Sequence, residues 1–331
     1  MKAGLSLEVK NLSTTFETPL GAVTAVDGVS FDVHPGEVLG LVGESGSGKS
    51  VTLRSLIGLI HPPGKVTGQV TWNGQDLLSV PPGRLRRVRG GEIAMIFQEP
   101  MTALNPVLTV GLQVEENLRA HTALDRGQRR ARAIELFDLV GIPDAKRRLE
   151  NYPHQFSGGM RQRVMIAIAL ASNPKLLLAD EPTTALDVTI QDQILKLILS
   201  LRDELQMGVV LVTHDLGVVA GTCDRIAVMY AGRIVESGSV LEIFDGPRHA
   251  YTRGLLASVP QAGAERGPLL AIEGTPPALS ALPTGCAFGP RCSFANDACR
   301  ATRPELAEIG PGRQVACLHH ETVAASKGQF A

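Results

Sequence analysis

The chain has 331 residues, of which 44% are hydrophobic, and its 32 basic and 33 acidic residues give a formal net charge of -1. This length allows one large domain with an appendage, and the balanced charge argues against a nucleic-acid-binding arm or a polybasic membrane anchor. No apolar run approaches the roughly 18 residues of a membrane-spanning helix, and the early charges argue against a signal peptide. We therefore expect a soluble chain that acts at a membrane only through a partner.

Residues 5–42 predict short strands separated by glycine-rich turns, at 5–9, 22–26, 29–33 and 38–42. A glycine-rich segment follows the last strand, and residues 51–59 then have the pattern of an amphipathic helix. A strand, a glycine-rich turn and a helix form the context of a phosphate-binding loop. The segment consists of Gly43, Glu44, Ser45, Gly46, Ser47, Gly48, Lys49 and Ser50.

The residue types in this segment suit a bound phosphate. Glycines let successive backbone N–H groups curl around the anion, and the helix N-terminus adds a partial positive charge. Lys49 would reach the β- and γ-phosphates, and the Ser50 hydroxyl would hold Mg²⁺. The segment therefore predicts a nucleoside triphosphate site.

From Arg84 to about Ala171 the pattern is mainly helical, although residues 92–97 predict a strand that ends just before Gln98. Beyond it, strands are predicted at 175–180, 208–213 and 225–230, and a helix at 190–206. Apolar strands that alternate with helices indicate a mostly parallel sheet covered on both faces.

Two carboxylates, Asp180 and Glu181, end the strand at 175–180. Ligand groups gather at such strand ends in doubly wound folds. Asp180 would hold Mg²⁺ directly or through water. Glu181 should face the other way on the strand, which leaves it free to polarise an attacking water as a general base. A charged strand end that simply enters a turn is the alternative, and the upstream phosphate loop makes the carboxylate site the better interpretation.

Three further polar positions have both a functional and a structural interpretation. Ser157 opens a second glycine-rich turn before an apolar helix; it can cap that helix, and the turn can also bind an anion. One nucleotide needs one phosphate loop, so this turn would suit a nucleotide bound by another copy or a homologue. His214 follows a strand and could contact a γ-phosphate or be merely exposed. Gln98 could join a Mg²⁺ and water network or mark a domain junction.

With these motifs in this order, residues 5–256 resemble an ATP-binding-cassette (ABC) transporter ATPase. The signature motif departs from its commonest form, with Phe156 for Leu and Met160 for Gln, but the phosphate-contacting Ser157 and Gly159 are present. The matching motifs are Walker A at 43–50, the Q-loop at Gln98, the signature at 157–160, Walker B at Asp180, the catalytic glutamate at Glu181, the D-loop at 184–187 and the switch histidine at His214.

The resemblance implies an α/β fold: a P-loop NTPase (RecA-like) core, an antiparallel β subdomain, and a helical signature subdomain at about 99–165. It implies an ABC nucleotide-binding domain over 1–256 and an extension over 257–331. It also implies catalytic roles for Lys49, Glu181 and His214, and Mg²⁺ ligands at Ser50, Gln98 and Asp180. The implied ATP-binding residues are Phe16, which alternatively is a core strand residue, Gly43, Glu44, Ser45, Gly46, Ser47, Gly48, Lys49, Ser50, Val51, Gln98, Ser157, Gly158, Gly159, Asp180, Glu181, Asp187 and His214.

The resemblance also implies partners. It implies that two ATPase subunits close head to tail on two ATP molecules and drive two transmembrane permease subunits. An extracytoplasmic substrate-binding protein would deliver the cargo to these permease subunits. We expect the second ATPase to be a homologue, the segment 98–111 to dock the permease, and the chain to lie peripherally on the cytoplasmic face of the membrane. No nucleic acid partner is expected.

After about Leu256 the chain becomes rich in proline and glycine, which predicts a loop-rich appendage. It contains four of the five cysteines, Cys286, Cys292, Cys299 and Cys317. Two disulfides would use the even count but do not suit the reducing cytosol. A zinc site could use all four thiolates or include His319 or His320, although the cysteines of zinc modules are usually paired at shorter spacing in the sequence. A 4Fe–4S cluster tolerates more varied spacing.

Residues 97–106, 156–163, 247–252 and 285–292 resemble the oligopeptide/dipeptide importer branch, whose C-terminal extension can bind a 4Fe–4S cluster. The resemblance then implies a peptide-transporting translocase, in which the chain hydrolyses ATP to energise di- or oligopeptide import and the cluster is structural. Nickel, glutathione or an opine is an alternative cargo. A soluble cassette protein of ribosomes or DNA repair is a further alternative, but the second cassette or coiled-coil insert usual in such proteins is missing.

Overall fold

The structure is a computed structural model that describes residues 7–19, 21–183, 187–258 and 272–326. The chain forms two compact units. One consists of Met1–Leu7, Val33–Glu37 and Trp72–Val212, and the other of Glu8–Asp32, Val38–Thr71 and Thr213–Ala331. None of the helices within the described ranges is both long and apolar enough to cross a membrane. The predicted division of the chain near residue 256 stays a prediction.

The first unit is built on three parallel strands, β6 (Ile93–Ile96), β7 (Leu176–Asp180) and β8 (Gly208–Val212). Ile93 pairs with Leu176, which in turn pairs with Gly208. Every residue of β7 and β8 is buried. Buried parallel strands require continuous apolar runs rather than alternation, which is why the sequence revealed them. The predicted strands at 92–97, 175–180 and 208–213 are confirmed.

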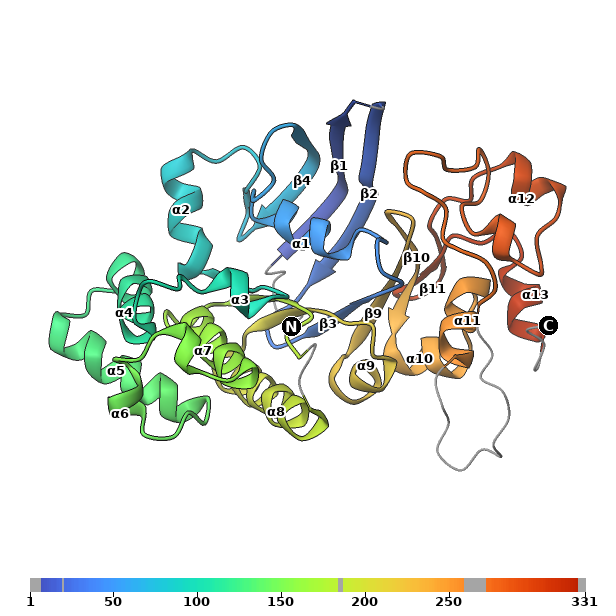
Figure 1. Cartoon of the computed structure of the whole chain (residues 1–331). Helices are drawn as coiled ribbons and strands as arrows, with labels where there is room; N and C mark the ends of the chain where they lie inside the picture. Colours follow the sequence, from blue (N-terminus) through green and yellow to red (C-terminus); the bar gives the residue numbers. More distant parts are fainter. Residues whose placement is uncertain (1–6, 20, 184–186, 259–271, 327–331) are drawn as a thin grey trace. The chain divides into compact units, whose positions relative to one another are not determined.

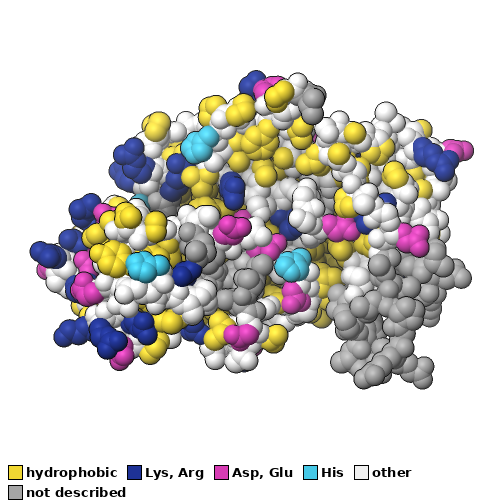
Figure 2. All heavy atoms as spheres, in the orientation of Figure 1, with side chains coloured by type: hydrophobic (Ala, Val, Ile, Leu, Met, Phe, Trp, Pro, Cys, Tyr) yellow, Lys and Arg dark blue, Asp and Glu magenta, His cyan; other side chains and the backbone are white. Residues whose placement is uncertain are grey.

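Helices make up most of the rest of this unit, and α4 packs against both α5 and α7 (Figure 1). Lys and Arg side chains gather over α5 and α6 on the face seen in Figure 2. The elements are β5 (Gln75–Asp76), α2 (Pro82–Gly91), α3 (Pro100–Ala103), α4 (Val110–His121), α5 (Arg126–Leu139), α6 (Ala145–Arg148), the 3-10 turn η1 (Pro153–Gln155), α7 (Gly158–Leu170) and α8 (Val188–Leu205).

The second unit contains an N-terminal sheet with the strand order β2 (Gly21–Val33), β1 (Leu7–Thr18) and β4 (Gly64–Trp72). The sequence predicted two strands at 22–26 and 29–33, and this prediction is wrong because β2 runs through both. Gly28 bends the strand without ending it: its φ is 69°, and its N–H donates to Ser13 Oγ at 2.9 Å. Glycine tolerates this left-handed backbone at little cost.

A second sheet in this unit pairs β3 (Val38–Val42) with β9 (Arg225–Tyr230) in parallel. The antiparallel strand β10 (Arg233–Ser239) follows β9, and β12 (Arg313–Val315) and β11 (Ala307–Gly310) extend the edge. The sequence predicted only loops in this part of the extension. A three-residue strand has no readable period, and it forms here because β10 offers an edge to pair with.

The extension also contributes to the core of the second unit. Phe288 and Val323 are buried in the same cluster as Tyr230 and Tyr251. Besides α1 (Lys49–Leu56), the helical elements of this unit are α9 (Leu216–Thr222), α10 (Val240–Asp245), α11 (Ala250–Ala257), the 3-10 turn η2 (Gly289–Arg291), α12 (Asp297–Ala301) and α13 (His320–Ala325).

Candidate active site

The glycine-rich segment lies between β3, which ends at Val42, and α1, which begins at Lys49. This confirms the predicted strand, turn and helix. Two of its glycines have no room for a side chain: a Cβ at Gly43 would lie 2.2 Å from the Met229 carbonyl oxygen, and one at Gly48 would lie 2.4 Å from that of Ala25. Both also have positive φ, 152° and 102°. The tight path of the loop therefore requires glycine at both positions.

The Lys49 ammonium is held inside this loop, and its side chain is buried, with 6% of the residue exposed. Its Nζ donates to the carbonyl oxygens of Gly43 at 2.8 Å and Glu44 at 2.9 Å, and to Ser47 Oγ at 3.3 Å. Ser50, half-buried, is the next residue of α1. The loop thus presents a fixed positive charge beside the N-terminus of a helix, an arrangement that binds anions.

In the other unit, the two predicted carboxylates end β7, and Asp180 is fully buried. Glu181 does not continue the strand as expected: its φ is 47°, so a left-handed turn, and not strand alternation, directs its side chain. Its N–H donates to the Val212 carbonyl oxygen at 3.0 Å. A left-handed non-glycine residue costs conformational energy and often marks a functional site.

Gln98 and Glu181, 83 positions apart in the sequence, meet in this unit. Gln98 Nε2 donates to Glu181 Oε2 at 3.3 Å. The amide follows β6 and the carboxylate follows β7, and these neighbouring parallel strands end at the same edge. The structure thus brings two of the predicted site residues together, and their roles stay predictions.

Ser157 caps α7, as the sequence predicted, because its Oγ accepts a hydrogen bond from the Met160 N–H at 3.4 Å. Ser157 and Gly158 are exposed. Gln162, the fifth residue of α7 and 2% exposed, donates from Nε2 to the Pro182 carbonyl oxygen at 2.5 Å. The signature helix is thus joined to the turn that carries Glu181, while its first turn faces outward.

The remaining predicted site residues are His214, Asp187 of the D-loop and Phe16. His214 is exposed. Asp187 caps α8, and its Oδ1 accepts from the Ile190 N–H at 3.0 Å. The other D-loop residues, 184–186, lie outside the described residues. Phe16 is half-buried on β1 beside Gly64, where an added Cβ would lie 2.8 Å from its Cε1.

The four clustered cysteines line one small cavity of about 20 Å³, and all are free thiols. Burial raises the pKa of Cys292 and of Cys317 to about 11, and it also raises the pKa of Cys286. In the described ranges, no group of three or more His, Cys, Asp or Glu side chains is arranged to hold a metal ion. The predicted iron–sulfur cluster therefore stays a prediction.

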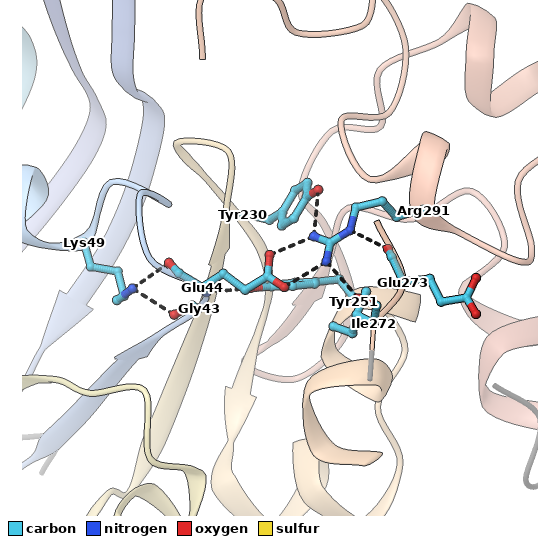
Figure 3. A network of polar contacts seen from close by, with 8 residues as sticks. All are labelled: Gly43, Glu44, Lys49, Tyr230, Tyr251, Ile272, Glu273 and Arg291. Atoms are coloured by element: carbon cyan, nitrogen blue, oxygen red, sulfur yellow. Dashed lines mark hydrogen bonds and ion pairs between the residues drawn. The ribbon is translucent and has the colours of Figure 1, made fainter. Parts of the chain in front are cut away.

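Sequence reasoning missed two side chains that hold the loop at Glu44. The Tyr251 hydroxyl accepts from the Glu44 N–H at 2.7 Å, and Arg291 forms an ion pair with the Glu44 carboxylate (Figure 3). These partners lie 207 and 247 positions away in the chain. No local sequence pattern indicates a contact between residues so far apart in the chain.

Two family models and several known proteins are similar to this chain. A family model described as "ABC transporter" matches residues 26–184, and one described as "Oligopeptide/dipeptide transporter, C-terminal region" matches residues 235–299. The oligopeptide transport ATP-binding protein OppD of Salmonella typhimurium is 49% identical, over 96% of this chain and 94% of OppD. A Brucella abortus protein whose name refers to peptide import and ATP binding is 52% identical over 96% of both chains.

Among solved structures, the dimeric post-hydrolysis state of the ATP-binding cassette MJ0796 bound to ADP and Pi matches with a TM-score of 0.64 and 32% identity. It covers 71% of this chain and 98% of that one. The fold with mixed α/β sheets is thus that of an ABC ATPase, and its P-loop core is the one predicted. The chain belongs to the ABC transporter ATP-binding proteins, in the branch that carries the oligopeptide/dipeptide transporter C-terminal region.

Proposed function

We propose that this chain hydrolyses ATP to energise the import of di- or oligopeptides through a membrane permease. The observation that carries the proposal is the folded phosphate loop with the buried Lys49 ammonium bonded to two of its carbonyl oxygens. At the end of β7, Asp180 would help to hold Mg²⁺, and Glu181, which follows it, would accept a proton from the attacking water. The names of the OppD and Brucella relatives support the peptide cargo; nickel, glutathione or opine import is the alternative.

ATP would bind with its phosphates on residues 43–51 and its adenine against Phe16. Ser50, Gln98 and Asp180 supply hydroxyl, amide and carboxylate oxygens, the donor types that Mg²⁺ prefers, so these residues would hold the ion. When bound, Mg²⁺ neutralises charge on the β- and γ-phosphates. Lys49 already has a fixed position beside the loop, so it needs little reorganisation to contact the same oxygens.

Glu181 would accept a proton from the attacking water as the general base. The hydrogen bond from Gln98 holds one of its carboxylate oxygens, and the left-handed backbone fixes the direction of the side chain. His214 would contact the γ-phosphate. Its exposure leaves its imidazole accessible to a nucleotide.

The turn at Ser157, Gly158 and Gly159, of which the first two are exposed and the third is half-buried, supports a head-to-tail dimer, in which this turn and Asp187 contact ATP held by a second ATPase subunit. MJ0796 is described as a dimeric cassette. We propose a homologous partner ATPase, two permease subunits contacted by residues 98–111, an extracytoplasmic binding protein, and a peripheral position on the cytoplasmic face of the membrane.

We also propose that Cys286, Cys292, Cys299 and Cys317 hold a 4Fe–4S cluster, with Zn²⁺ as the alternative. The support is that all four thiols line one cavity. Four thiolates are the usual ligand set of such a cluster, which when bound would pin this loop-rich segment. A cavity of about 20 Å³ has room for little more than one water, so the surrounding loops would open on loading. Iron and sulfide assays after anaerobic purification decide: stoichiometric zinc without sulfide would refute the cluster.

The test of the transport function uses the transporter reconstituted in liposomes with its binding protein. The Glu181→Gln variant should bind ATP but fail to drive uptake of labelled peptide, because a neutral amide cannot accept the proton. Glu135→Gln, on the exposed face of α5, is the matched control and should transport normally. Normal uptake by Glu181→Gln would refute the role of Glu181, and uptake of a non-peptide cargo alone would refute the peptide assignment.

A further inference from the structure

Glu44 connects the phosphate loop to the C-terminal extension through three different groups (Figure 3). Its carbonyl oxygen accepts from Lys49 Nζ at 2.9 Å. Its N–H donates to the Tyr251 hydroxyl at 2.7 Å. Its carboxylate binds Arg291. One residue of the loop therefore touches both the Lys49 ammonium and a residue more than 240 positions away in the sequence.

The ion pair between Arg291 and Glu44 is bidentate. Arg291 Nη1 lies 2.7 Å from Glu44 Oε2, and Nη2 lies 3.0 Å from Oε1. The Arg291 side chain is only 6% exposed and that of Glu44 is 24% exposed. Exposed ion pairs contribute little because solvent screens them, but a buried, bidentate guanidinium–carboxylate pair has both strength and a fixed geometry.

The other donors of the Arg291 guanidinium are also engaged. Nε donates to the Glu273 carbonyl oxygen at 3.0 Å, Nη2 to that of Ile272 at 3.3 Å, and Nη1 to the Tyr230 hydroxyl at 3.3 Å. The guanidinium carbon also lies 5.9 Å from the centroid of the Tyr230 ring. The guanidinium is therefore fixed from several sides and can hold the carboxylate in one place.

The segment that carries Arg291 is itself built into the core. Arg291 ends η2, directly before Cys292. Phe288, just before η2, packs against the rings of Tyr230 and Tyr251, with centroid distances of 5.3 and 5.4 Å. The same part of the extension therefore lines the four-thiol cavity and contacts the loop through Glu44.

We propose that Arg291 is a positioning residue for the nucleotide site: through Glu44 it holds the phosphate loop, and with it Lys49, in the conformation that binds ATP. Tyr251 supports the same residue at its backbone. The C-terminal extension thereby contributes to ATP affinity, although none of its described residues is among the proposed phosphate ligands. This inference rests on ATP binding by the loop, as proposed above.

The test measures Mg·ATP affinity of the full chain at equilibrium, together with KM and kcat of the assembled transporter. Arg291→Gln should raise Kd and KM about five- to tenfold with little change in kcat, because a loosened loop weakens binding but leaves the hydrolytic groups in place. Glu44→Gln should have a similar effect. The double variant should be no worse than either single variant, since both remove the same contact. Arg291→Lys keeps the positive charge but lacks the paired N–H donors of the guanidinium. Its Kd and KM should therefore lie between those of the wild type and of Arg291→Gln.

Arg303→Gln is the matched control. Arg303 also belongs to the extension and pairs with a cassette carboxylate, Asp27, at 3.1 Å, and within the described residues this polar contact does not involve residues 43–50. It should leave Kd and KM within twofold of the wild type, even if it lowers stability. An equal rise in KM for Arg303→Gln would show a general structural effect and overturn the proposal.

Further outcomes would also contradict the inference. If Arg291→Gln binds ATP like the wild type, or if the effects of Glu44→Gln and Arg291→Gln simply multiply, Arg291 does not act through Glu44. If Arg291→Gln does not fold, Glu44→Gln and Arg291→Lys still decide, and unchanged affinity in both refutes the proposal. A wild-type chain that binds no ATP would instead refute the proposed function.

Discussion

The two glycine-rich turns of this chain are held in opposite ways. The phosphate loop at residues 43–50 is fixed by contacts from distant parts of the chain, since Tyr251 and Arg291 bind Glu44 and the Lys49 ammonium fills its centre. The signature turn at Ser157 and Gly158 is exposed, and among the described residues the Ser157 hydroxyl bonds to its own helix. A turn that binds its ligand alone benefits from preorganisation. A turn that completes a site on another subunit has to remain accessible.

Removing the ammonium from the fixed turn should have the largest effect. Lys49→Ala removes the charge beside the phosphates and leaves the Gly43 and Glu44 carbonyl oxygens without their buried donor. We expect ATPase activity of the assembled transporter to fall about 10²–10³-fold, as when one preorganised donor is lost. Steady-state hydrolysis and nucleotide titration measure this. Lys65→Ala, a surface lysine of the same unit, should behave like the wild type, and an active Lys49→Ala would contradict the assignment.

The pH dependence of stability should also reveal a buried histidine, His249, next to the Tyr251 that holds the phosphate loop. His249 is 2% exposed, its Nδ1 accepts from the Tyr251 N–H at 3.1 Å, and burial lowers its pKa to about 4. Unfolding returns the pKa to about 6.5, so the unfolded chain binds more protons between these values, and stability falls as pH decreases from about 6.5 to about 4. The loss between pH 7 and pH 5 should be about 2 kcal/mol.

Urea unfolding at the two pH values measures this difference. His249→Asn can keep the acceptor without the titrating ring and should reduce the pH dependence by about that amount. The exposed His61→Asn is the control and should retain the wild-type dependence. An unchanged pH dependence in His249→Asn would show that another group is responsible.

Features of the chain differ in how far the sequence could predict them. Strand β7, its two carboxylates and the phosphate loop follow local rules, because buried parallel strands are continuously apolar and the loop needs glycine at fixed positions. Glu181 was expected to continue the strand, but it lies in a left-handed turn that no local rule indicated. The pair formed by Glu44 and Arg291 could not be predicted, because nothing near either residue specifies a partner 247 positions away. The short strands of the extension form through pairing, β12 with β10 and β11 with β12, which no local pattern indicates.

Smaller effects should separate the capping role of Ser157 from its proposed role in the partner site. Ser157 caps α7 and Ser239 caps α10, and their Oγ atoms lie 3.4 and 3.3 Å from the backbone nitrogens whose N–H they accept. Replacing either with Ala should cost about 1 kcal/mol of stability, the usual value of an N-cap. Only Ser157→Ala should also lower ATPase activity of the assembled transporter. Equal losses of activity in both variants would mean that Ser157 acts only as a cap.

A substitution in the signature turn should leave ATP binding by the isolated chain unchanged, and this is the most direct test of how the two turns divide their roles. We hold that the phosphate loop and the signature turn of one chain serve two different nucleotides. Ser157→Arg places a bulky side chain on the exposed turn and should leave Mg·ATP affinity of the isolated full chain within twofold of the wild type, while it abolishes hydrolysis by the assembled transporter. If Ser157→Arg weakens ATP binding by the isolated chain as much as Lys49→Ala does, both turns bind the same nucleotide and the account is wrong.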